Sequence, residues 1–337
     1  MSALERGDLE RYAQVAAEIE AAVKQRIAGQ PGLIRQTLVG LLAEGHVLLE
    51  GVPGLGKTEL VKAFSEAIGL GFARVQFTPD LMPADIVGTQ VLVDDESGRR
   101  GFEYQPGPVF TNLLLADEIN RATPKTQAAL LEAMQERHVT VAGETRDLPR
   151  PFLVLATQNP IELEGTYPLP EAQLDRFMFK VTVDPPTADV LEEILRRTTS
   201  GTIPEVPVAA DIETLASMIA MTPHLPVASH LIQYVARLIE ATHPDGDTAS
   251  PPVKRYVRWG SSPRGAQSIV LAAKAAALIE GRPHVTADDI RWAVPSALRH
   301  RLVLGYEATA EGVRSDVLID ELLHDVPEPK PEIRGAP

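Results

Sequence analysis

One stretch of eight residues has the most specific chemistry in the sequence: Gly51-Val52-Pro53-Gly54-Leu55-Gly56-Lys57-Thr58. It matches G-x-x-x-x-G-K-[ST] at every defined position, which is the pattern of a phosphate-binding loop. Its glycines let consecutive backbone N–H groups point at phosphates, and the helix that follows directs its positive end to the same place. The pattern predicts that Lys57 binds the β- and γ-phosphates of a nucleoside triphosphate and that the Thr58 hydroxyl holds Mg²⁺.

Two acids, Asp117 and Glu118, follow an apolar run at 112–116. Such a run is typical of a strand buried on both faces of a parallel sheet, and ligands collect at the carboxyl ends of such strands. We therefore expect Asp117 to hold Mg²⁺, directly or through water, and Glu118 to orient and polarise the water that attacks the γ-phosphate. Asn159 follows a second apolar run at 152–157. It is expected to bond the γ-phosphate or the attacking water, to form an Asx turn before the next proline, or both.

Hydrophobic patterning predicts an α/β core over residues 1–185, with an N-terminal amphipathic helix and two inserted hairpins. The hairpins are expected near 89–104 and 138–149, although the first segment could also be an ordinary surface loop. Short apolar or β-rich runs bounded by turn residues predict strands at 46–50, 72–77, 112–117, 152–157 and 178–183.

The pattern changes after Asp184-Pro185-Pro186, where the strand signal disappears. Helical periodicity then predicts an all-helical domain over 186–325. The remaining residues, 326–337, contain too few apolar side chains to pack and predict a flexible tail. The expected helices are at about 187–198, 211–221, 226–243, 264–280, 286–299 and 313–324.

Composition limits the classes of function. The formal net charge of -14 over 337 residues argues against broad binding to a nucleic-acid backbone. The absence of cysteine excludes disulfides and thiolate metal sites. The first residues lack the apolar core of a signal peptide, and no apolar run is long enough for a membrane span. We therefore expect a cytoplasmic protein without a membrane span.

In their order along the chain, these motifs resemble those of the AAA+ ATPases and, within them, the MoxR family. The resemblance extends from residue 27 to about residue 304. It implies a five-stranded parallel sheet, a helical lid over the nucleotide, and ATP with Mg²⁺ as cofactors. It also places Gln30 and Glu59 among the nucleotide-binding residues. The motifs concerned are at 29–30, 51–58, 114–122, 127–134, 156–160, 165–172, 174–177, 262–264 and 298–302.

The same resemblance suggests roles for three further side chains. Asn159 is similar to the sensor 1 residue, and Arg264 is similar to sensor 2, which reports the γ-phosphate to the lid. Arg176 is similar to the arginine finger, which acts on the nucleotide of a neighbouring subunit. Each arginine could instead be a surface ion-pair partner, for example of Glu171 or Asp175. The family usually has alanine where this chain has Gly265, which lowers helix propensity but leaves Arg264 in place.

An arginine supplied by a neighbour requires head-to-tail contacts, and such contacts make a ring when they close. The family suggests a hexamer whose hairpins project toward the central channel or face. We therefore expect a chaperone-like factor that remodels or matures protein clients. A separate partner carrying a von Willebrand factor A domain is a further expectation from the family.

Other functions remain open at this point. A nucleic-acid motor of the same AAA+ branch would carry similar hairpins, but the acidic balance and the hairpin tip Ala142-Gly143-Glu144 disfavour it. A small-molecule kinase would not need the acidic pair together with a finger and a long helical lid. A binding switch that hardly hydrolyses ATP is disfavoured by Glu118, which a degenerate site usually loses. GTP is less favoured than ATP because no N-K-x-D motif is present.

Overall fold

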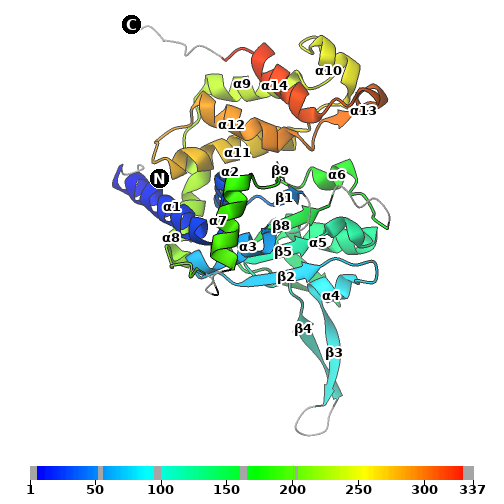
Figure 1. Ribbon diagram of the computed structural model, residues 1–337. Helices are drawn as coiled ribbons and strands as arrows, with labels where there is room; N and C mark the ends of the chain where they lie inside the picture. The colour runs from blue at the N-terminus through cyan, green and yellow to red at the C-terminus, as the bar shows by residue number, and fades with distance from the viewer. Residues whose placement is uncertain are drawn as a thin grey trace.

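The computed structural model describes residues 6–51, 56–94, 100–159, 165–199, 201 and 204–328. Its centre is a sheet of five parallel strands in the order β2-β5-β8-β1-β9 (Figure 1). Because all five strands run in one direction, their carboxyl ends lie along one edge of the sheet and their amino ends along the other. We call these the carboxyl edge and the amino edge. The strands are β1 (Val47–Glu50), β2 (Phe72–Gln76), β5 (Leu113–Asp117), β8 (Leu153–Gln158) and β9 (Phe179–Thr182).

The strands alternate their side chains between two hydrophobic cores. In β5, Leu113 and Leu115 belong to one core, and Leu114 and Ala116 belong to the other. All four are fully buried. Helices therefore cover both faces of the sheet, and this explains why the predicted strands are continuous apolar runs. The helices of the core are α1 (Arg6–Arg26), α2 (Pro31–Leu42), α3 (Lys57–Ile68), α4 (Pro83–Val87), η1 (Ile119–Arg121), α5 (Pro124–Glu136) and α6 (Glu171–Leu174).

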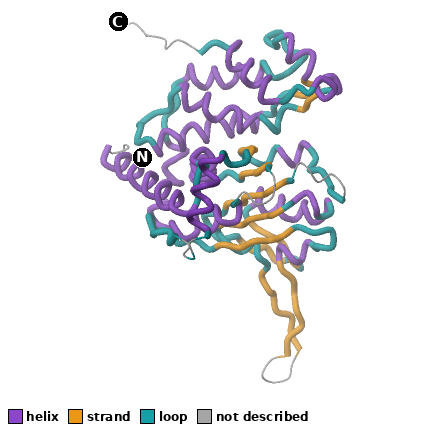
Figure 2. Tube along the Cα trace, viewed as in Figure 1, coloured by secondary structure: helices purple, strands orange, loops and turns teal. Residues whose placement is uncertain are grey.

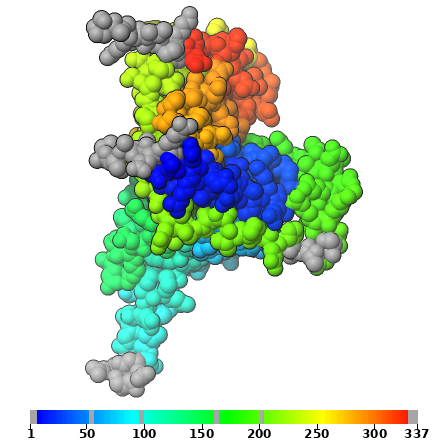
Figure 3. Space-filling view, turned by 90° about the vertical axis from the view of Figure 1, so that its left-hand side faces the viewer, coloured from blue at the N-terminus to red at the C-terminus, as the bar shows by residue number. Residues whose placement is uncertain are grey.

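Both predicted hairpins are antiparallel strand pairs. The long one consists of β3 (Gly88–Asp94) and β4 (Arg100–Pro106), and the short one of β6 (His138–Val141) and β7 (Glu144–Asp147). The long hairpin projects from the body on the side away from the C-terminal helices (Figures 2 and 3). The alternative of an ordinary surface loop at this segment is therefore wrong.

The region after β9 is mainly helical, as predicted. It also contains a two-stranded antiparallel sheet of β10 (Val257–Trp259) and β11 (Val303–Leu304), which the sequence analysis did not predict. Its helices are α7 (Ala188–Thr198), α8 (Ile212–Met221), η2 (Thr222–His224), α9 (Ser229–Glu240), α10 (Pro251–Tyr256), α11 (Pro263–Ile279), α12 (Ala287–Leu298), α13 (Tyr306–Glu311) and α14 (Ser315–Asp325). We call α8 to α14, with β10 and β11, the lid.

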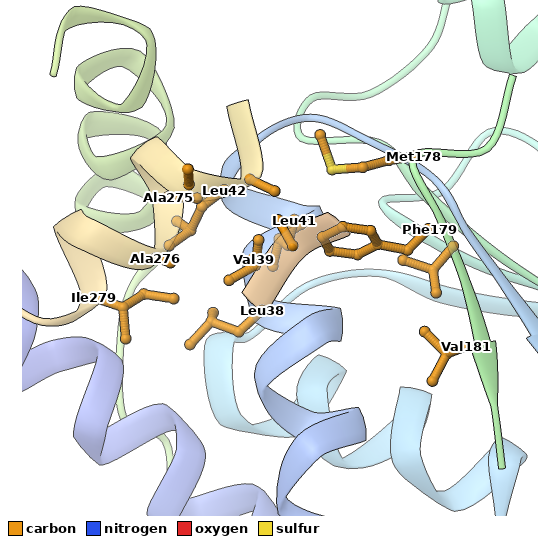
Figure 4. Close-up of a cluster of buried hydrophobic side chains, with 14 of the residues drawn as sticks. Leu38, Val39, Leu41, Leu42, Met178, Phe179, Val181, Ala275, Ala276 and Ile279 are labelled. Atoms are coloured by element: carbon orange, nitrogen blue, oxygen red, sulfur yellow. The ribbon is translucent and has the colours of Figure 1, made fainter. Parts of the chain in front are cut away.

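Helix α2 joins the lid to the sheet. Its apolar side chains contact β9 on one side and α11 on the other (Figure 4). As a result, one hydrophobic core runs from α1 through the sheet into the lid. The side chains of this joint are Leu38, Val39, Leu41 and Leu42 from α2, Met178, Phe179 and Val181 from the β9 segment, and Ala275, Ala276 and Ile279 from α11.

Among the described residues, no single helix is long and apolar enough to cross a membrane. One pair of helices, Ile212–His224 and Ser229–Glu240, passes a test of length and composition only when the two are taken together, and they meet at a bend of 84°. Both helices contribute buried side chains to the hydrophobic core of the lid.

Candidate nucleotide-binding site

A cavity of about 260 Å³ lies at the carboxyl edge of the sheet. It is formed by the start of α3 and by the ends of β1, β2, β5 and β8. Residues 52–55 of the predicted phosphate-binding loop lie outside the described residues. The structure brings together eight of the other predicted residues in this cavity: Gly51, Gly56, Lys57, Thr58, Glu59, Asp117, Glu118 and Asn159.

Lys57 is the first residue of α3 and is half-buried at the mouth of the loop. Its Nζ donates a hydrogen bond of 2.6 Å to the carbonyl of Gly51. Burial lowers the pKa of Lys57, and the negative charges of Asp117, Glu118 and Glu50 oppose this effect. A partly desolvated ammonium beside a helix N-terminus is well placed to bind a phosphate anion.

Asp117 is held by two donors. The Thr157 hydroxyl donates to Oδ1 at 2.7 Å, and the Arg74 guanidinium donates to Oδ2 at 2.7 Å. The same Thr157 oxygen accepts the backbone N–H of Glu118 at 2.8 Å. Thr157 therefore fixes both acids relative to β8, the strand that carries Asn159 at its end.

The donor set fits Mg²⁺ rather than a transition metal. Asp117 and the Thr58 hydroxyl offer hard oxygen ligands, and Mg²⁺ is usually bound by one or two carboxylates together with phosphates and water. Within the part of the chain that the structure describes, no group of three or more His, Asp or Glu side chains could hold a metal alone. The site therefore has the composition of one that binds the ion together with a triphosphate.

Glu118 has a left-handed backbone conformation, with φ of 56°, where the chain turns away from β5. Its Oε2 accepts hydrogen bonds from Gln76 at 2.8 Å and from Arg121 at 2.9 Å. Thus two side chains restrain the carboxylate that is predicted to activate water.

Sequence reasoning missed Arg74, Gln76 and Thr157. The sequence contained a signal for the first two. Residues two apart on a strand share a face, so Arg74 and Gln76 lie on one face of β2, and Gln76 ends this strand beside β5. Thr157 directly precedes the polar end of β8 and is hydrogen-bonded to both acids. Its role depends on the pairing of β5 with β8, which the sequence alone does not give.

A second cavity of about 360 Å³ at the carboxyl edge contains the predicted residue Gln30. It lies between the start of α2 and the segment from Val181 to Val190, beyond the end of β9. Gly29 has φ of +69°, and a Cβ there would lie 2.2 Å from Cγ1 of Val190. A glycine is therefore required for α7 to close this cavity. Because β9 pairs with β1, the cavity is on the other side of the phosphate-binding loop from Asp117.

The two predicted arginines, Arg176 and Arg264, are not near the phosphate-binding cavity. Both line a cavity of about 250 Å³ at the amino edge, where His46 precedes β1 and Met178 precedes β9. The full length of the strands therefore separates them from Lys57. Contrary to the expectation for sensor 2, the structure does not bring Arg264 to the nucleotide site of its own chain.

The predicted acidic partners of Arg176 are also not observed. Arg176 donates to the carbonyl of Leu131, within α5, at 2.7 Å. The Asp175 carboxylate is instead bonded to Arg301 and Ser262. The surface ion pair considered for Arg176 is therefore absent from the described contacts.

His46 shows that the amino edge is rigidly built. It is fully buried, accepts the Val154 N–H at Nδ1 and donates from Nε2 to the carbonyl of Met134, each at 3.0 Å. Burial, and secondarily the positive charge of Arg137, lower the pKa of His46 to about 3. The imidazole is therefore neutral at physiological pH and links β8 to α5.

The two hairpins contact each other near their bases. The Arg146 guanidinium lies 4.0 Å from the ring centroid of Tyr104 and also pairs with Glu144. The Tyr104 hydroxyl donates to the carbonyl of Val87. Arg146, the basic side chain nearest the short hairpin's tip, is thus already engaged within the chain.

Comparisons with known proteins agree with this geometry. Residues 46–179 match the profile described as "ATPase family associated with various cellular activities (AAA)", and residues 252–322 match that of the "AAA lid domain". Together with the five-stranded sheet and the phosphate-binding cavity, these matches define an AAA+ ATPase, an enzyme that hydrolyses ATP.

The chain is 46% identical over 308 residues to "Chaperone MoxR1" of Mycobacterium tuberculosis, which covers 91% of this chain and 81% of that protein. It is 32% identical over 349 residues to "Protein MoxR" of Methylorubrum extorquens, covering 98% and 100% of the two chains. A crystal structure of a "putative ATPase" from Cytophaga hutchinsonii superposes with a TM-score of 0.90, at 38% identity, covering 96% and 98%. The chain therefore belongs to the MoxR family of AAA+ ATPases.

These findings confirm the fold class and the family predicted from the sequence. They also confirm the prediction of an ATP-hydrolysing enzyme. The domain limits at residues 185 and 325 and the roles of the individual site residues stay predictions.

Proposed function

We propose that the protein is a Mg-ATP-dependent remodelling factor that works as a ring and acts, chaperone-like, on protein clients. The observation that supports this proposal is the separation of its functional groups. The phosphate-binding groups lie at the carboxyl edge, and the arginines expected to act on the γ-phosphate lie at the amino edge. This separation within one chain supports a site that is completed by a second chain.

Within one chain, the carboxyl edge would bind and orient the nucleotide. Lys57 would bond the β- and γ-phosphates, and Thr58 and Asp117 would hold Mg²⁺, which neutralises phosphate charge when bound. Glu118 would accept a proton from the attacking water, and Asn159 would orient that water or the γ-phosphate. Gln30 would contact the base in the adjoining cavity.

The amino edge would serve the neighbouring chain. Arg176 would stabilise the charge that develops on the neighbour's γ-phosphate, an effect worth about 10³–10⁵ in rate for arginine fingers. Because Arg264 lines the same cavity, we propose that it also faces the neighbour rather than its own nucleotide. Head-to-tail contacts of this kind close into a ring, and the family suggests six subunits.

The long hairpin is the proposed contact with clients. Leu92 and Phe102 form a cross-strand pair in its outer half and are 55% and 73% exposed. An exposed apolar pair on a projecting ribbon is suited to an apolar segment of another protein. The relative named "Chaperone MoxR1" supports a chaperone-like role. A separate partner with a von Willebrand factor A domain and a cytoplasmic location remain predictions from the sequence.

The structure gives no observation that favours the alternative of a nucleic-acid motor. Arg146 is stacked on Tyr104 and paired with Glu144, and the net charge of the chain is -14. Stimulation of the ATPase by DNA or RNA would nevertheless favour that alternative over a protein client.

The shared site can be tested by mixing two inactive variants, Arg176→Ala and Lys57→Ala. The first keeps an intact pocket and the second keeps an intact finger. In rings assembled at random from equal amounts, half of the subunits have a working pocket, and half of these sit beside a working finger. We expect the mixture to recover about a quarter of the wild-type ATPase rate per subunit. No recovery, with mixed assembly confirmed by differently tagged subunits, would contradict the proposal.

A further inference from the structure

The segment that carries Arg176 is held by side chains of the lid. Residues 175–178 follow α6 and lead into β9, so they belong to the core by sequence. Their backbone carbonyls nevertheless accept hydrogen bonds from the end of α12, where Arg299, His300 and Arg301 occur in succession. The lid is thus joined to the core through the short stretch that contains the proposed finger.

Arg301 makes most of these bonds. Its side chain is almost fully buried, and its Nε donates to Asp175 Oδ1 at 2.7 Å. Its Nη2 donates to the carbonyls of Asp175 at 3.0 Å and Phe177 at 2.8 Å. Its Nη1 donates to the carbonyl of Met178 at 3.1 Å. The carbonyls on both sides of Arg176 therefore bond to the same guanidinium nitrogen.

Asp175 extends this network to Arg264. Its carboxylate accepts the Ser262 hydroxyl at 2.8 Å and 3.0 Å as well as the Arg301 Nε. Ser262 is the N-cap of α11, and its hydroxyl also accepts the backbone N–H of Arg264 at 3.2 Å. Thus one partly buried cluster connects the backbones of Arg176 and Arg264.

We infer that Asp175, Ser262 and Arg301 are positioning residues for ATP hydrolysis at the neighbouring subunit's site. Acting through Arg176 and Arg264, they set where these two side chains are presented to the neighbour. This inference rests on the proposed function, because it requires an arginine supplied by one chain to the pocket of the next.

The chemistry of the cluster favours this role over general stabilisation. A buried ion pair is weak evidence for stability, because the cost of removing its charges from water can exceed the attraction between them. A planar guanidinium, however, fixes several acceptors in one geometry, and a lysine ammonium does not. The chain also leaves space for Arg301: a Cβ at Gly265 would lie 3.0 Å from its Cδ and 2.1 Å from the Ser261 hydroxyl.

The test uses Arg301→Lys, which keeps the charge and loses the fork of donors. We expect its ATPase rate to fall about tenfold or more, because a misplacement of about 1 Å can cost a hundredfold. The KM for ATP should stay within about twofold, since its own pocket is intact. Mixed in equal amounts with Lys57→Ala, it should recover to about a quarter of the wild-type rate, as Arg176→Ala does.

Ser262→Ala provides a second variant, which is needed if circular dichroism shows that Arg301→Lys does not fold. It removes one partner of Asp175 and should show a smaller loss, and its rate per intact pocket should rise on mixing with Lys57→Ala. The matched control is Arg282→Lys, because Arg282 forms a bidentate pair with Asp289 inside the lid and, among the described contacts, makes no bond to residues 175–178. Below its unfolding temperature, this control should hydrolyse ATP at the wild-type rate.

The outcomes distinguish the positioning role of the cluster from the proposed action of Arg176 on the neighbouring subunit. Recovery of Arg301→Lys to the level of Arg176→Ala supports the inference. Unchanged activity of Arg301→Lys, or a loss that Lys57→Ala does not recover while Arg176→Ala is recovered, overturns the inference and leaves the trans finger in place. A loss in Arg282→Lys that is recovered on mixing also overturns it. Failure of Arg176→Ala itself to recover overturns the proposed function, and the inference with it.

Discussion

At the carboxyl edge of the sheet, charged side chains around a cavity are bonded to other side chains, whereas at the amino edge arginines are bonded to backbone carbonyls. Asp117 and Glu118 are held mainly by side chains, namely Thr157, Arg74, Gln76 and Arg121. Arg176 is held by a main-chain oxygen within α5, and Arg301 is held mainly by main-chain oxygens that follow α6 or lie near the end of α12.

Under the proposed function, this difference explains how one subunit would serve two sites. Side-chain bonds at the carboxyl edge can exchange when a charged ligand enters, since each partner can rotate away. At the amino edge the accepting main-chain oxygens are fixed by the backbone, so only the arginine side chain of each bond can rotate away. The first edge is therefore suited to binding and chemistry, and the second to presenting a fixed group to a neighbour.

The largest expected effect comes from Glu118→Gln, which tests whether the chemistry belongs to the carboxyl edge. ATP turnover should fall about 10²–10⁴-fold, the usual contribution of a general base, while ATP affinity is kept. A steady-state ATPase assay with a nucleotide-binding titration measures both quantities. Glu280→Gln, a carboxylate removed from the lid surface, should be normal, and unchanged turnover in Glu118→Gln would remove that residue from the mechanism.

The next effect compares the two edges directly, with Lys57→Ala and Arg264→Ala. Lys57→Ala should lose about a hundredfold in ATP affinity, because charged hydrogen bonds worth about 3 kcal/mol are lost. Arg264→Ala should bind ATP normally in separated subunits, since its side chain lies at the other edge. Fluorescent-nucleotide titration at low protein concentration provides the measurement. Equal losses in both variants would break the division between the edges.

A smaller effect concerns pH. Burial lowers the pKa of Lys57 below its usual value of 10.5 in the free protein, and bound phosphates would raise it again. Above the free-state pKa, binding must therefore take up a proton, and the Kd for ATP should rise by up to about tenfold per pH unit. Calorimetric titrations in buffers of different ionisation enthalpy would detect this proton. Lys57→Arg keeps its charge and should lack this rise; a wild-type Kd that does not change with pH would contradict the argument.

The smallest effect tests the rigidity of the amino edge. His46 has a pKa of about 3 when folded and about 6.5 when unfolded, so only the unfolded state takes up a proton as pH falls below 6.5. Stability is thus lost in acid, by about 1.4 kcal/mol between pH 7.5 and pH 5.5 from this histidine. The difference between wild type and His46→Gln in urea unfolding at the two pH values isolates the effect. An equal acid loss in both proteins would show that His46 is not the cause.

The features that the sequence predicted well have local signatures. The phosphate-binding octet is defined by its own residues, and the strands that carry Asp117 and Asn159 are continuous apolar runs because both faces of the sheet are covered. Their observed limits differ from the predicted ones by a residue or so. Local patterning was also enough for both hairpins, whose strands pair within a few residues of their turns.

The features that it did not predict depend on contacts between distant residues. The place of Arg264 depends on how α11 packs against α2, and periodicity does not contain this information. The strands β10 and β11 are too short to produce a pattern and pair across α11 and α12. The bonds of Arg301 to residues 175–178 likewise cross more than a hundred positions of the chain.

Helix α2, packed between β9 and α11, has a consequence for how the enzyme changes shape. The hydrophobic core passes through this helix. A hinge motion that separates the lid from the sheet would therefore expose the apolar side chains of α2 to water. Heat should therefore melt both halves of the subunit together, and a calorimetric scan of the nucleotide-free protein should contain one endotherm, not two. In the proposed ring, ATP hydrolysis would then drive rigid-body rotation of whole subunits relative to their neighbours.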